Sequence, residues 1–534
     1  MTANKAKDAL LLMPLRADKW DEELLLETFV NIGSLIPLLR GTNNHILYGR
    51  RGTGKTHVFY FLKNTIEKEN DDICIYIDLR TIGSTGSIYS DTRIPYEQRA
   101  SRLISDILNE MRNQLIEYIL KDDLNKDRYL SEVTPILDDL SSLLDNKMID
   151  GCVKQELGNE NENRNENSSS FTLAQTPSFA HSATSGEKEI QHYHFSTEGN
   201  YIDYLNFNSI SQTLQIILGK LSPHKIWLFL DEYAELHSDM QIALADIIRR
   251  IFCPLKDFIF KIAAIEHRSI FKKQIDAKNY LGLELGADCS VCNLDDFMVF
   301  GNNQAQSTFF FRDLIFRHTN AMLPVGEKYQ DSTILIKDIF TQESAFDELV
   351  LAAEGVPRDA FNILAKAITE DYNSKISVNN IRKAAKKWYT EDKLHSVISY
   401  PQAQNLLTWI LTNVINKRRA RAFLLRNDIE YELIDYLYDS RILHIIKQDI
   451  SSRDNPGMKF SVYSIDYGCY VDLLNTTQKP LGLYEVESDD GQSEYCQVPK
   501  DDYRSIRRAI LNMDDFEKFR DQSSTPKEST IQPD

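Results

Sequence analysis

The sequence predicts an α/β fold built on a parallel β-sheet that carries a phosphate-binding loop. A short apolar strand, 46–48, is followed directly by the pattern G-x-x-x-x-G-K-T over Gly49–Thr56 and then by the apolar run Val58–Leu62 of a helix. Near-continuous apolar runs at Ile73–Ile77 and Ile226–Leu230 are typical of parallel strands that are covered on both faces. The order strand, glycine loop, helix indicates a nucleotide-binding P-loop domain.

The loop Gly49–Thr56 has the residue types that phosphate binding requires. Its glycines let successive backbone N–H groups face an anion without a Cβ clash, and the following helix N-terminus points its partial positive charge at the same place. Lys55 can neutralise the β- and γ-phosphates of ATP, and the Thr56 hydroxyl can bind Mg²⁺. The expected nucleotide-binding residues are Gly49, Arg50, Arg51, Gly52, Thr53, Gly54, Lys55, Thr56 and His57. Two alternatives remain: a turn that binds nothing, and a loop that binds nucleotide without hydrolysing it.

Two adjacent carboxylates, Asp231 and Glu232, follow the apolar strand at 226–230. Ligands of open α/β sheets bind beyond the carboxyl ends of the strands, so we expect both side chains near the P-loop. Asp231 would hold Mg²⁺, directly or through water, and Glu232 would orient and deprotonate the attacking water. The alternative is a strand whose acidic end merely faces solvent.

The next predicted strand, Phe258–Ile265, ends in Glu266–His267–Arg268. In many P-loop ATPases a polar or basic group at this position senses the γ-phosphate, which makes Arg268 a candidate catalytic residue. An ordinary ion pair at the strand end is the alternative. A last strand is expected at 288–294, where Cys289 and Cys292 are interpreted as buried thiols rather than a zinc site, because no second cysteine pair lies nearby.

Composition limits the classes of function. The chain has 534 residues, a net charge of −18 and seven cysteines. The negative charge excludes a uniformly basic nucleic-acid-binding surface, so any DNA contact would be a local patch. The few cysteines indicate a reducing compartment, and neither a signal peptide nor an apolar run of membrane-spanning length is found. We expect a cytoplasmic protein without membrane contact.

Apolar periodicity predicts the helices that cover the sheet. One is expected over Glu22–Ile36, ended or kinked by Pro37. The others are expected over 96–120, 121–157, 205–221 and 240–252. The polar stretch at about 155–192 cannot bury enough apolar surface to offset its ordering entropy, so we expect a disordered insertion inside the sheet domain.

Four motifs in order resemble those of AAA+ ATPases. They are the glycine loop, Asp231–Glu232, the strand before Arg268, and Glu354–Ala360, which looks like the sensor 2 motif at the start of a lid helix. The resemblance is to the origin-recognition-complex-like (initiator and loader) clade, with features of the STAND signalling ATPases. It implies a five-stranded parallel sheet with flanking helices, a helical lid, and Arg358 as a lid arginine that reaches the γ-phosphate. A helix-capping role for Arg358 is the alternative.

The resemblance and the order of predicted elements together give a domain order. We expect the AAA+ domain at 1–300, the helical lid at 301–395 and a winged-helix-like domain at 396–480. A mostly flexible tail is expected at 481–534, because few apolar residues follow Tyr484. An arginine finger acting on a neighbouring subunit is also implied, and Arg249 and Arg250 are its nearest candidates.

The C-terminal region departs from a DNA-binding winged helix. Its predicted recognition helix, Asp428–Ser440, is acidic and would be repelled by phosphate. A basic cluster just before it could contact a DNA backbone or be a solvated helix end; its members are Lys417, Arg418, Arg419, Arg421 and Arg426.

The sequence therefore predicts an ATP-binding and ATP-hydrolysing switch. Its nucleotide state would control self-assembly or engagement of a partner protein. The alternative function is a DNA-binding loader or initiator that uses the basic cluster at 417–426.

Overall fold

The computed structural model of the chain describes most of the sequence. The described residues are 2–83, 89–121, 125–144, 147–157, 193–203, 205–295, 304–427, 431–451, 457–474, 483–487, 493–497 and 510–524. Within this part of the chain, every helix is too short or too polar to cross a bilayer.

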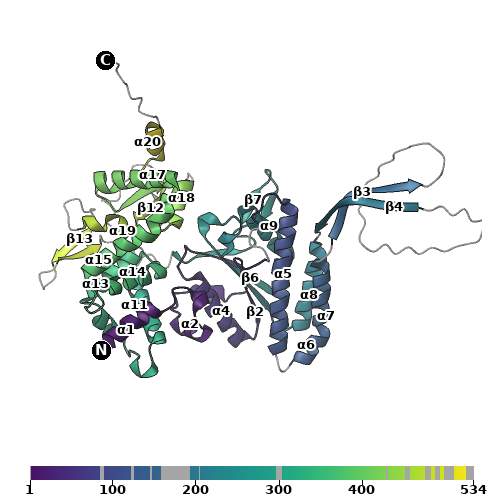
Figure 1. The fold of residues 1–534 in the computed structure, drawn as a ribbon, viewed down its shortest axis with the longest axis horizontal. Coiled ribbons are helices and arrows are strands. Elements are labelled where there is room, and N and C mark those ends of the chain that lie inside the picture. The colour runs from purple at the N-terminus through teal and green to yellow at the C-terminus, as the bar shows by residue number, and fades with distance from the viewer. Residues whose placement is uncertain are drawn as a thin grey trace, which may run out of the picture.

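A five-stranded parallel sheet forms the core of the N-terminal half, as predicted (Figure 1). The strands are β1 (His45–Tyr48), β2 (Ile73–Asp78), β5 (Ile226–Asp231), β6 (Phe258–Ala264) and β9 (Ser290–Asn293). Their order in the sheet is β2-β5-β6-β1-β9. All of the pairings are parallel, so the carboxyl ends of all five strands meet at one edge.

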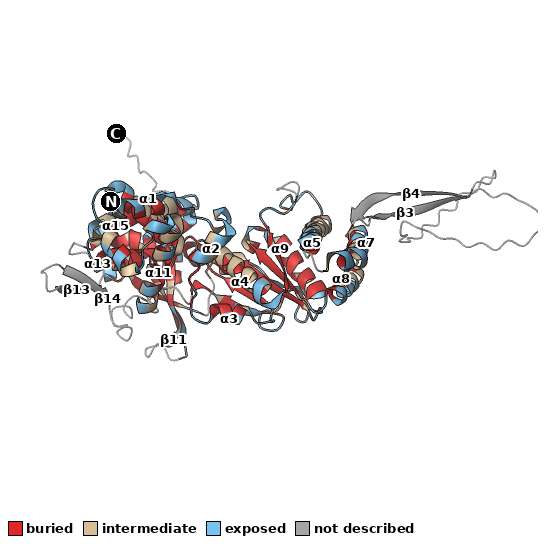
Figure 2. Ribbon diagram, turned by 90° about the horizontal axis from the view of Figure 1, so that it is seen from below, coloured by how far each residue is buried: buried red, intermediate tan, exposed pale blue. Residues whose placement is uncertain are grey.

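Helices cover both faces of this sheet and bury its strands (Figure 2). On one face, α4 (Lys55–Asn70) and α3 (Leu35–Leu39) pack with Trp227 and Phe229 of β5. The other face packs against α5 (Tyr96–Lys121), α7 (Thr134–Leu144), α8 (Phe207–Leu221) and α9 (Ser238–Ile247). The alternate β5 residues Ile226, Leu228 and Leu230 point to that second face. The unbroken apolar run thus reflects burial on both sides.

Between β2 and β5 the chain makes a long excursion. It contains α5, α6 (Lys126–Glu132), α7, an antiparallel ribbon of β3 (Lys147–Leu157) and β4 (Tyr193–Asp203), and then α8. In Figure 1 the ribbon projects away from the sheet. The helical prediction over 121–157 is therefore wrong for residues 147–157, whose partner strand lies far along the sequence. The predicted disordered insertion falls mostly on 158–192, outside the described residues.

The helix predicted over Glu22–Ile36 is in fact two helices, α2 (Glu22–Thr28) and α3. Between them the chain is extended, and Gly33 takes a positive φ of 54°. Pro37 lies inside α3 instead of ending it. This position is tolerated because the first N–H groups of a helix have no intrahelical partner.

A helical part follows the sheet. It comprises α11 (Gln304–Met322), α12 (Ser332–Ile339), α13 (Glu343–Ala353), α14 (Pro357–Glu370) and α15 (Val378–Trp388). The N-terminal helix α1 (Thr2–Leu12) also belongs here, since Ala6, Leu10 and Met13 are buried in the same apolar core. In addition, the ammonium group of Lys7 donates to the carbonyl of Tyr372 at 2.8 Å. The first helix of the chain is thus attached to the helical part and not to the sheet.

The C-terminal region contains a small antiparallel sheet. The elements in chain order are α17 (Pro401–Ile410), β10 (Ala422–Arg426), α18 (Glu432–Asp439), β11 (Leu443–Ser451) and β12 (Lys459–Ile465). The strands are ordered β10-β12-β11. Helix α18 begins at Glu432, and residues 428–430 of the predicted acidic helix lie outside the described part. The assignment of this region as a winged helix stays a prediction.

Part of the region expected to be a flexible tail is helical. Helix α20 (Met513–Ser524) buries Phe516 beside Trp409, with ring centroids 5.6 Å apart. The hairpin of β13 (Leu483–Glu487) and β14 (Ser493–Gln497) precedes it.

Candidate functional site

The glycine loop joins the carboxyl end of β1 to the start of α4, as its pattern predicts. Gly52 and Gly54 have φ angles of 89° and 100°, a backbone region that favours glycine. A Cβ atom at Gly49 would lie 2.6 Å from the Thr53 hydroxyl. The glycines are therefore needed for the shape of this loop, independently of any ligand.

Lys55 is one of two buried cations of the loop, the other being Arg50. Its ammonium group donates to the carbonyls of Gly49 at 2.7 Å and Arg50 at 3.2 Å. Burial lowers the pKa of Lys55, and the nearby carboxylates Asp231 and Glu232 oppose that shift. The side chain is held inside the curve of the loop, where its ammonium group could also donate to a bound phosphate.

Asp231 lies directly beside the start of α4. Its Oδ2 accepts hydrogen bonds from the Thr56 hydroxyl at 2.6 Å and the Tyr76 hydroxyl at 2.8 Å. Only 1% of Asp231 is exposed. The predicted pair of Thr56 and Asp231 is therefore brought together, and Tyr76 of β2 joins it.

Glu232 follows Asp231 at the rim of the pocket. Its backbone has a left-handed φ of 58°, which is unusual for a residue other than glycine, and its side chain lines the cavity. Burial raises the pKa of Glu232, and the charge of Asp231 adds to this effect. The guanidinium of Arg80, just beyond β2, lies 3.6 Å from its carboxylate.

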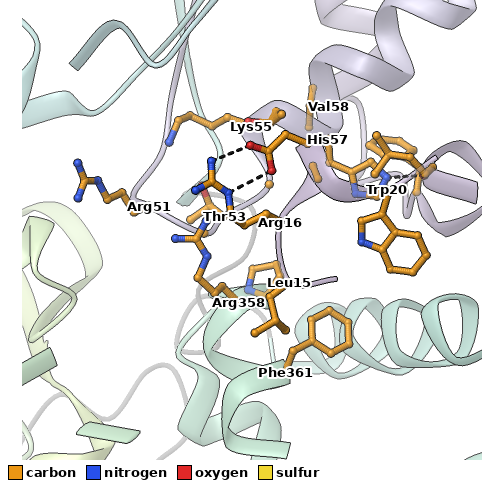
Figure 3. Close-up of a pocket in the computed structure, with 18 of the residues that line it drawn as sticks. Leu15, Arg16, Trp20, Arg51, Thr53, Lys55, His57, Val58, Arg358 and Phe361 are labelled. Atoms are coloured by element: carbon orange, nitrogen blue, oxygen red, sulfur yellow. Dashed lines mark hydrogen bonds and ion pairs between the residues drawn. The ribbon is translucent and has the colours of Figure 1, made fainter. Parts of the chain in front are cut away.

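The start of α14 lies directly on the glycine loop. The backbone N–H of Arg358 donates to the carbonyl of Gly52 at 3.3 Å. A Cβ atom on Gly52 would lie 2.7 Å from the Cβ of Arg358, so only glycine leaves room for this approach. Across the described residues, the guanidinium of Arg358 has no hydrogen-bond or ion-pair partner. An unpartnered arginine thus faces the loop from the helical part (Figure 3).

These residues enclose a cavity of about 360 Å³. Its polar end is formed by the loop from Arg51 to Thr56 with Glu232, Arg80 and Arg358. Its other end is apolar and aromatic, with Trp20, Leu25, Phe29, His57, Leu314, His318 and Phe361. The cavity therefore pairs a cationic end with an apolar end, as a nucleotide site requires.

The two histidines at the apolar end are neutral. Burial lowers the pKa of His57 to about 4 and that of His318 to about 3. One ring nitrogen of His57 forms a hydrogen bond with the carbonyl of Leu25 at 2.7 Å. One ring nitrogen of His318 forms a hydrogen bond with the carbonyl of Leu314 at 2.9 Å. Of the predicted nucleotide residues, His57 thus faces the apolar end and not the phosphate end.

Arg50 and Arg51 point away from Lys55. Arg51 pairs with Glu235 at the exposed rim. Arg50 is fully buried: its Nε donates to Asp295 at 3.0 Å, its Nη1 contacts His444 Nδ1 at 2.6 Å, and its guanidinium lies 5.1 Å from the Tyr438 ring centroid. The loop is therefore bound to both α18 and β11 of the C-terminal region.

The expectation that Arg268 faces the phosphate site is not met in this structure. Arg268 lies outside the cavity, and its Nε is 3.4 Å from Asp439 of α18. His267 is 3.5 Å from Asp435 of the same helix. Both side chains thus lie against acidic residues of α18 in the C-terminal region. From the sequence, the acidity of this helix indicated only that it would be repelled by DNA.

The remaining predicted residues lie apart from the cavity. Arg249 and Arg250 pair with Asp246, at 3.5 Å and 2.6 Å. Cys289 and Cys292 are buried free thiols, and no group of three or more metal-ligating side chains occurs within the described ranges.

Sequence reasoning missed Arg80, Tyr76, Trp20 and Arg16. Arg80 could have been predicted from its position after the strand at 73–78. Since β2 and β5 pair in parallel, the residues that follow both strands must lie at the same edge of the sheet. Tyr76 sits inside an apolar strand and shows no pattern of its own. Trp20 and Arg16 reach the cavity only through the tertiary path of the N-terminal segment.

Two solved structures similar to this chain are Cdc6p from Pyrobaculum aerophilum and the Orc1 protein of Aeropyrum pernix in complex with DNA. The first is 13% identical, with 86% of this chain and 93% of that chain covered and a TM-score of 0.30. The second is 14% identical, with 88% and 96% covered and a TM-score of 0.30. No family model and no curated protein sequence matches the chain. The fold assignment accordingly rests on the sheet order described above.

The close contact of Gly52 with Arg358 predicts a position-specific cost for a methyl group. Gly52→Ala and Gly286→Ala are matched, because both glycines have a φ of +89°, but a Cβ at Gly286 meets open space. We expect Gly286→Ala to lower the free energy of unfolding only by the cost of a left-handed backbone, about 1–2 kcal/mol. Gly52→Ala should melt at a clearly lower temperature than Gly286→Ala. Thermal denaturation of both variants measures the difference, and equal melting temperatures would contradict the packing of α14 on the loop.

Proposed function

We propose that the chain binds and hydrolyses ATP between the sheet domain (about 20–300) and the helical lid (about 301–395). The observation that supports this most directly is the cavity in which the glycine loop, Glu232 and the unpartnered Arg358 meet. Lys55 and the loop N–H groups would hold the phosphates. Arg358 would contribute a fork-shaped contact from the lid, because a guanidinium matches phosphate geometry and stays charged.

Thr56 at the start of α4 and Asp231 at the carboxyl end of β5 fit a magnesium ion. Thr56 and Asp231 present a hydroxyl and a buried carboxylate 2.6 Å apart, and hard oxygen ligands of this kind suit Mg²⁺. A bound Mg²⁺ would neutralise charge on the phosphates during transfer to water. The Tyr76 hydroxyl would keep the Asp231 carboxylate in place.

Glu232 is the proposed general base. It lies beyond Asp231, at the mouth of the cavity, and its pKa is raised by burial and by Asp231. A carboxylate with a raised pKa is a better proton acceptor from water than an ordinary one. Arg80, 3.6 Å away, would orient it.

We further propose that the nucleotide state controls the position of the C-terminal region. Arg50 of the glycine loop and Arg268 at the end of β6 both contact this region, through His444, Tyr438 and Asp439. A change in the loop on binding or losing a phosphate therefore acts on contacts that hold α18 in place. The output would be exposure of α18 and its neighbours to a partner protein or a second copy of the chain.

DNA binding is the second candidate. Arg418 and Arg419 are exposed just before β10, whereas the acidic face of α18 is turned to His267 and Arg268. A DNA contact would therefore use the basic cluster alone.

The ATPase proposal makes two linked predictions. Lys55→Ala should abolish nucleotide binding, because it removes the cation inside the loop. Glu232→Gln should keep binding and lose turnover by about 100-fold or more, the usual contribution of a general base. Fluorescent-nucleotide titration and phosphate release measure the two. Unchanged affinity of Lys55→Ala would contradict the phosphate site, and retained turnover of Glu232→Gln would place the base elsewhere.

The docking of α18 predicts a difference between two tyrosines of that helix. Tyr438→Ala removes the ring that lies over Arg50 and edge-on to His267. Tyr436→Ala is the matched control, because Tyr436 bonds Ser396 and packs on Tyr400 instead. We expect Tyr438→Ala alone to enlarge the radius of gyration in small-angle scattering, since its loss should cost about 3–5 kcal/mol of packing. Identical radii of gyration for both variants would contradict the proposal that Tyr438 holds α18 beside the glycine loop.

The DNA candidate predicts a strong salt dependence. Binding of duplex DNA in the presence of ATP should weaken steeply between low and physiological salt, and further when Arg418 and Arg419 are both changed to glutamine. No measurable binding at low salt would remove this candidate.

A further inference from the structure

The N-terminal strap, residues 14–20, crosses the proposed nucleotide site. Pro14, Leu15, Arg16, Asp18 and Trp20 all line the cavity. In Figure 3, Leu15 lies beside Arg358 and Phe361 of α14, Arg16 lies beside Thr53 of the glycine loop, and Trp20 lies on the side of His57. The motifs of the sequence account for the loop and the lid, but not for this third wall.

The two ends of the strap are attached to different parts of the protein. Before it, α1 is buried in the helical part through Ala6, Leu10 and Met13. After it, α2 lies against α4, and the Leu25 carbonyl of α2 is bonded to His57. Trp20 stands edge-on to His318 of α11, with ring centroids 5.5 Å apart. The strap thus connects the lid to the sheet domain across the cavity.

Arg16 brings a second guanidinium to the phosphate end. It lies close to Arg358, and the charge of Arg16 is among the causes that lower the pKa of Arg358, after burial and Arg441. Its partner in the structure is Asp18 of the same strap, at 3.1 Å and 2.7 Å. Half of the Arg16 side chain is exposed, so little packing holds it in this pair.

Asp18 connects the strap to the candidate base. Arg80 approaches Asp18 at 3.4 Å and Glu232 at 3.6 Å, and also pairs with Asp78. Burial acts to raise the pKa of Asp18, but Arg16 and Arg80 together hold this pKa below its usual value. Asp18 is therefore an anion placed between two arginines, Arg16 and Arg80.

We propose that Arg16 is a nucleotide-binding residue that contacts the phosphates of ATP beside Arg358. When no phosphate is present, its guanidinium forms an ion pair with Asp18 instead. This inference rests on the proposed ATP site and adds a ligand from outside its motifs. A phosphate group carries more charge than a carboxylate and accepts the same paired N–H bonds, so Arg16 exchanges one anion for the other. The strap then closes over the bound nucleotide together with the lid.

Two variants that break the same ion pair separate this role from a structural one. Arg16→Gln removes the proposed phosphate ligand. Asp18→Asn leaves Arg16 in place and removes the carboxylate that competes for it, together with the contact of that carboxylate to Arg80. Arg93→Gln is the matched control, because Arg93 pairs with Asp91 two residues away in the same manner, at 2.8 Å and 2.7 Å, and does not line the cavity. Affinity for a slowly hydrolysed ATP analogue with Mg²⁺ is measured by titration calorimetry on the full chain.

We expect Arg16→Gln to weaken binding by about tenfold, the usual loss for a charged hydrogen bond. Asp18→Asn should bind at least as tightly as wild type, and Arg93→Gln should equal wild type. Similar losses for Arg16→Gln and Asp18→Asn would show that the pair only supports the strap and would overturn the proposal. Wild-type affinity in Arg16→Gln would also overturn it. A wild-type chain that binds no analogue would instead overturn the proposed ATP site.

Discussion

The contact between Gly52 and the start of α14 determines how the two halves of the molecule meet. The Arg358 N–H bonds the Gly52 carbonyl at 3.3 Å, and a Cβ on Gly52 would be 2.7 Å from that of Arg358. The helical part can approach the loop this closely only because the loop has a glycine there. The Arg358 guanidinium consequently reaches the cavity that also contains Lys55 and Glu232. Without this approach, the phosphate end would be formed by the sheet domain alone.

The same loop is bound on its other side to the C-terminal region. Arg50 leaves the cavity and is buried among Asp295, His444 and Tyr438. A buried cation that loses one partner costs several kcal/mol, so the loop and these partners are expected to move together. Adjacent residues of one loop therefore face the lid, the proposed phosphate site and the C-terminal sheet. In the proposed function, this arrangement is the physical route by which the nucleotide state acts on domain position.

The local patterns of the sequence predicted the parts of the site that local geometry determines. The loop Gly49–Thr56 and the pair Asp231–Glu232 lie where strand polarity requires, at the carboxyl edge of a parallel sheet. The strap residue Arg16 and the orientation of Arg268 depend on packing between distant segments, for which one sequence carries no periodic signal. The β3–β4 ribbon was missed for the same reason, since its partner strands are far apart along the chain.

Hydrogen exchange with and without a slowly hydrolysed ATP analogue and Mg²⁺ tests the central claim most directly. One ligand bound between the glycine loop and the proposed lid should raise protection together at 49–56, at the start of α14 and in the strap at 14–20. Protection of the loop without any change at 357–361, or no change at 49–56, would contradict a phosphate site shared by the two halves.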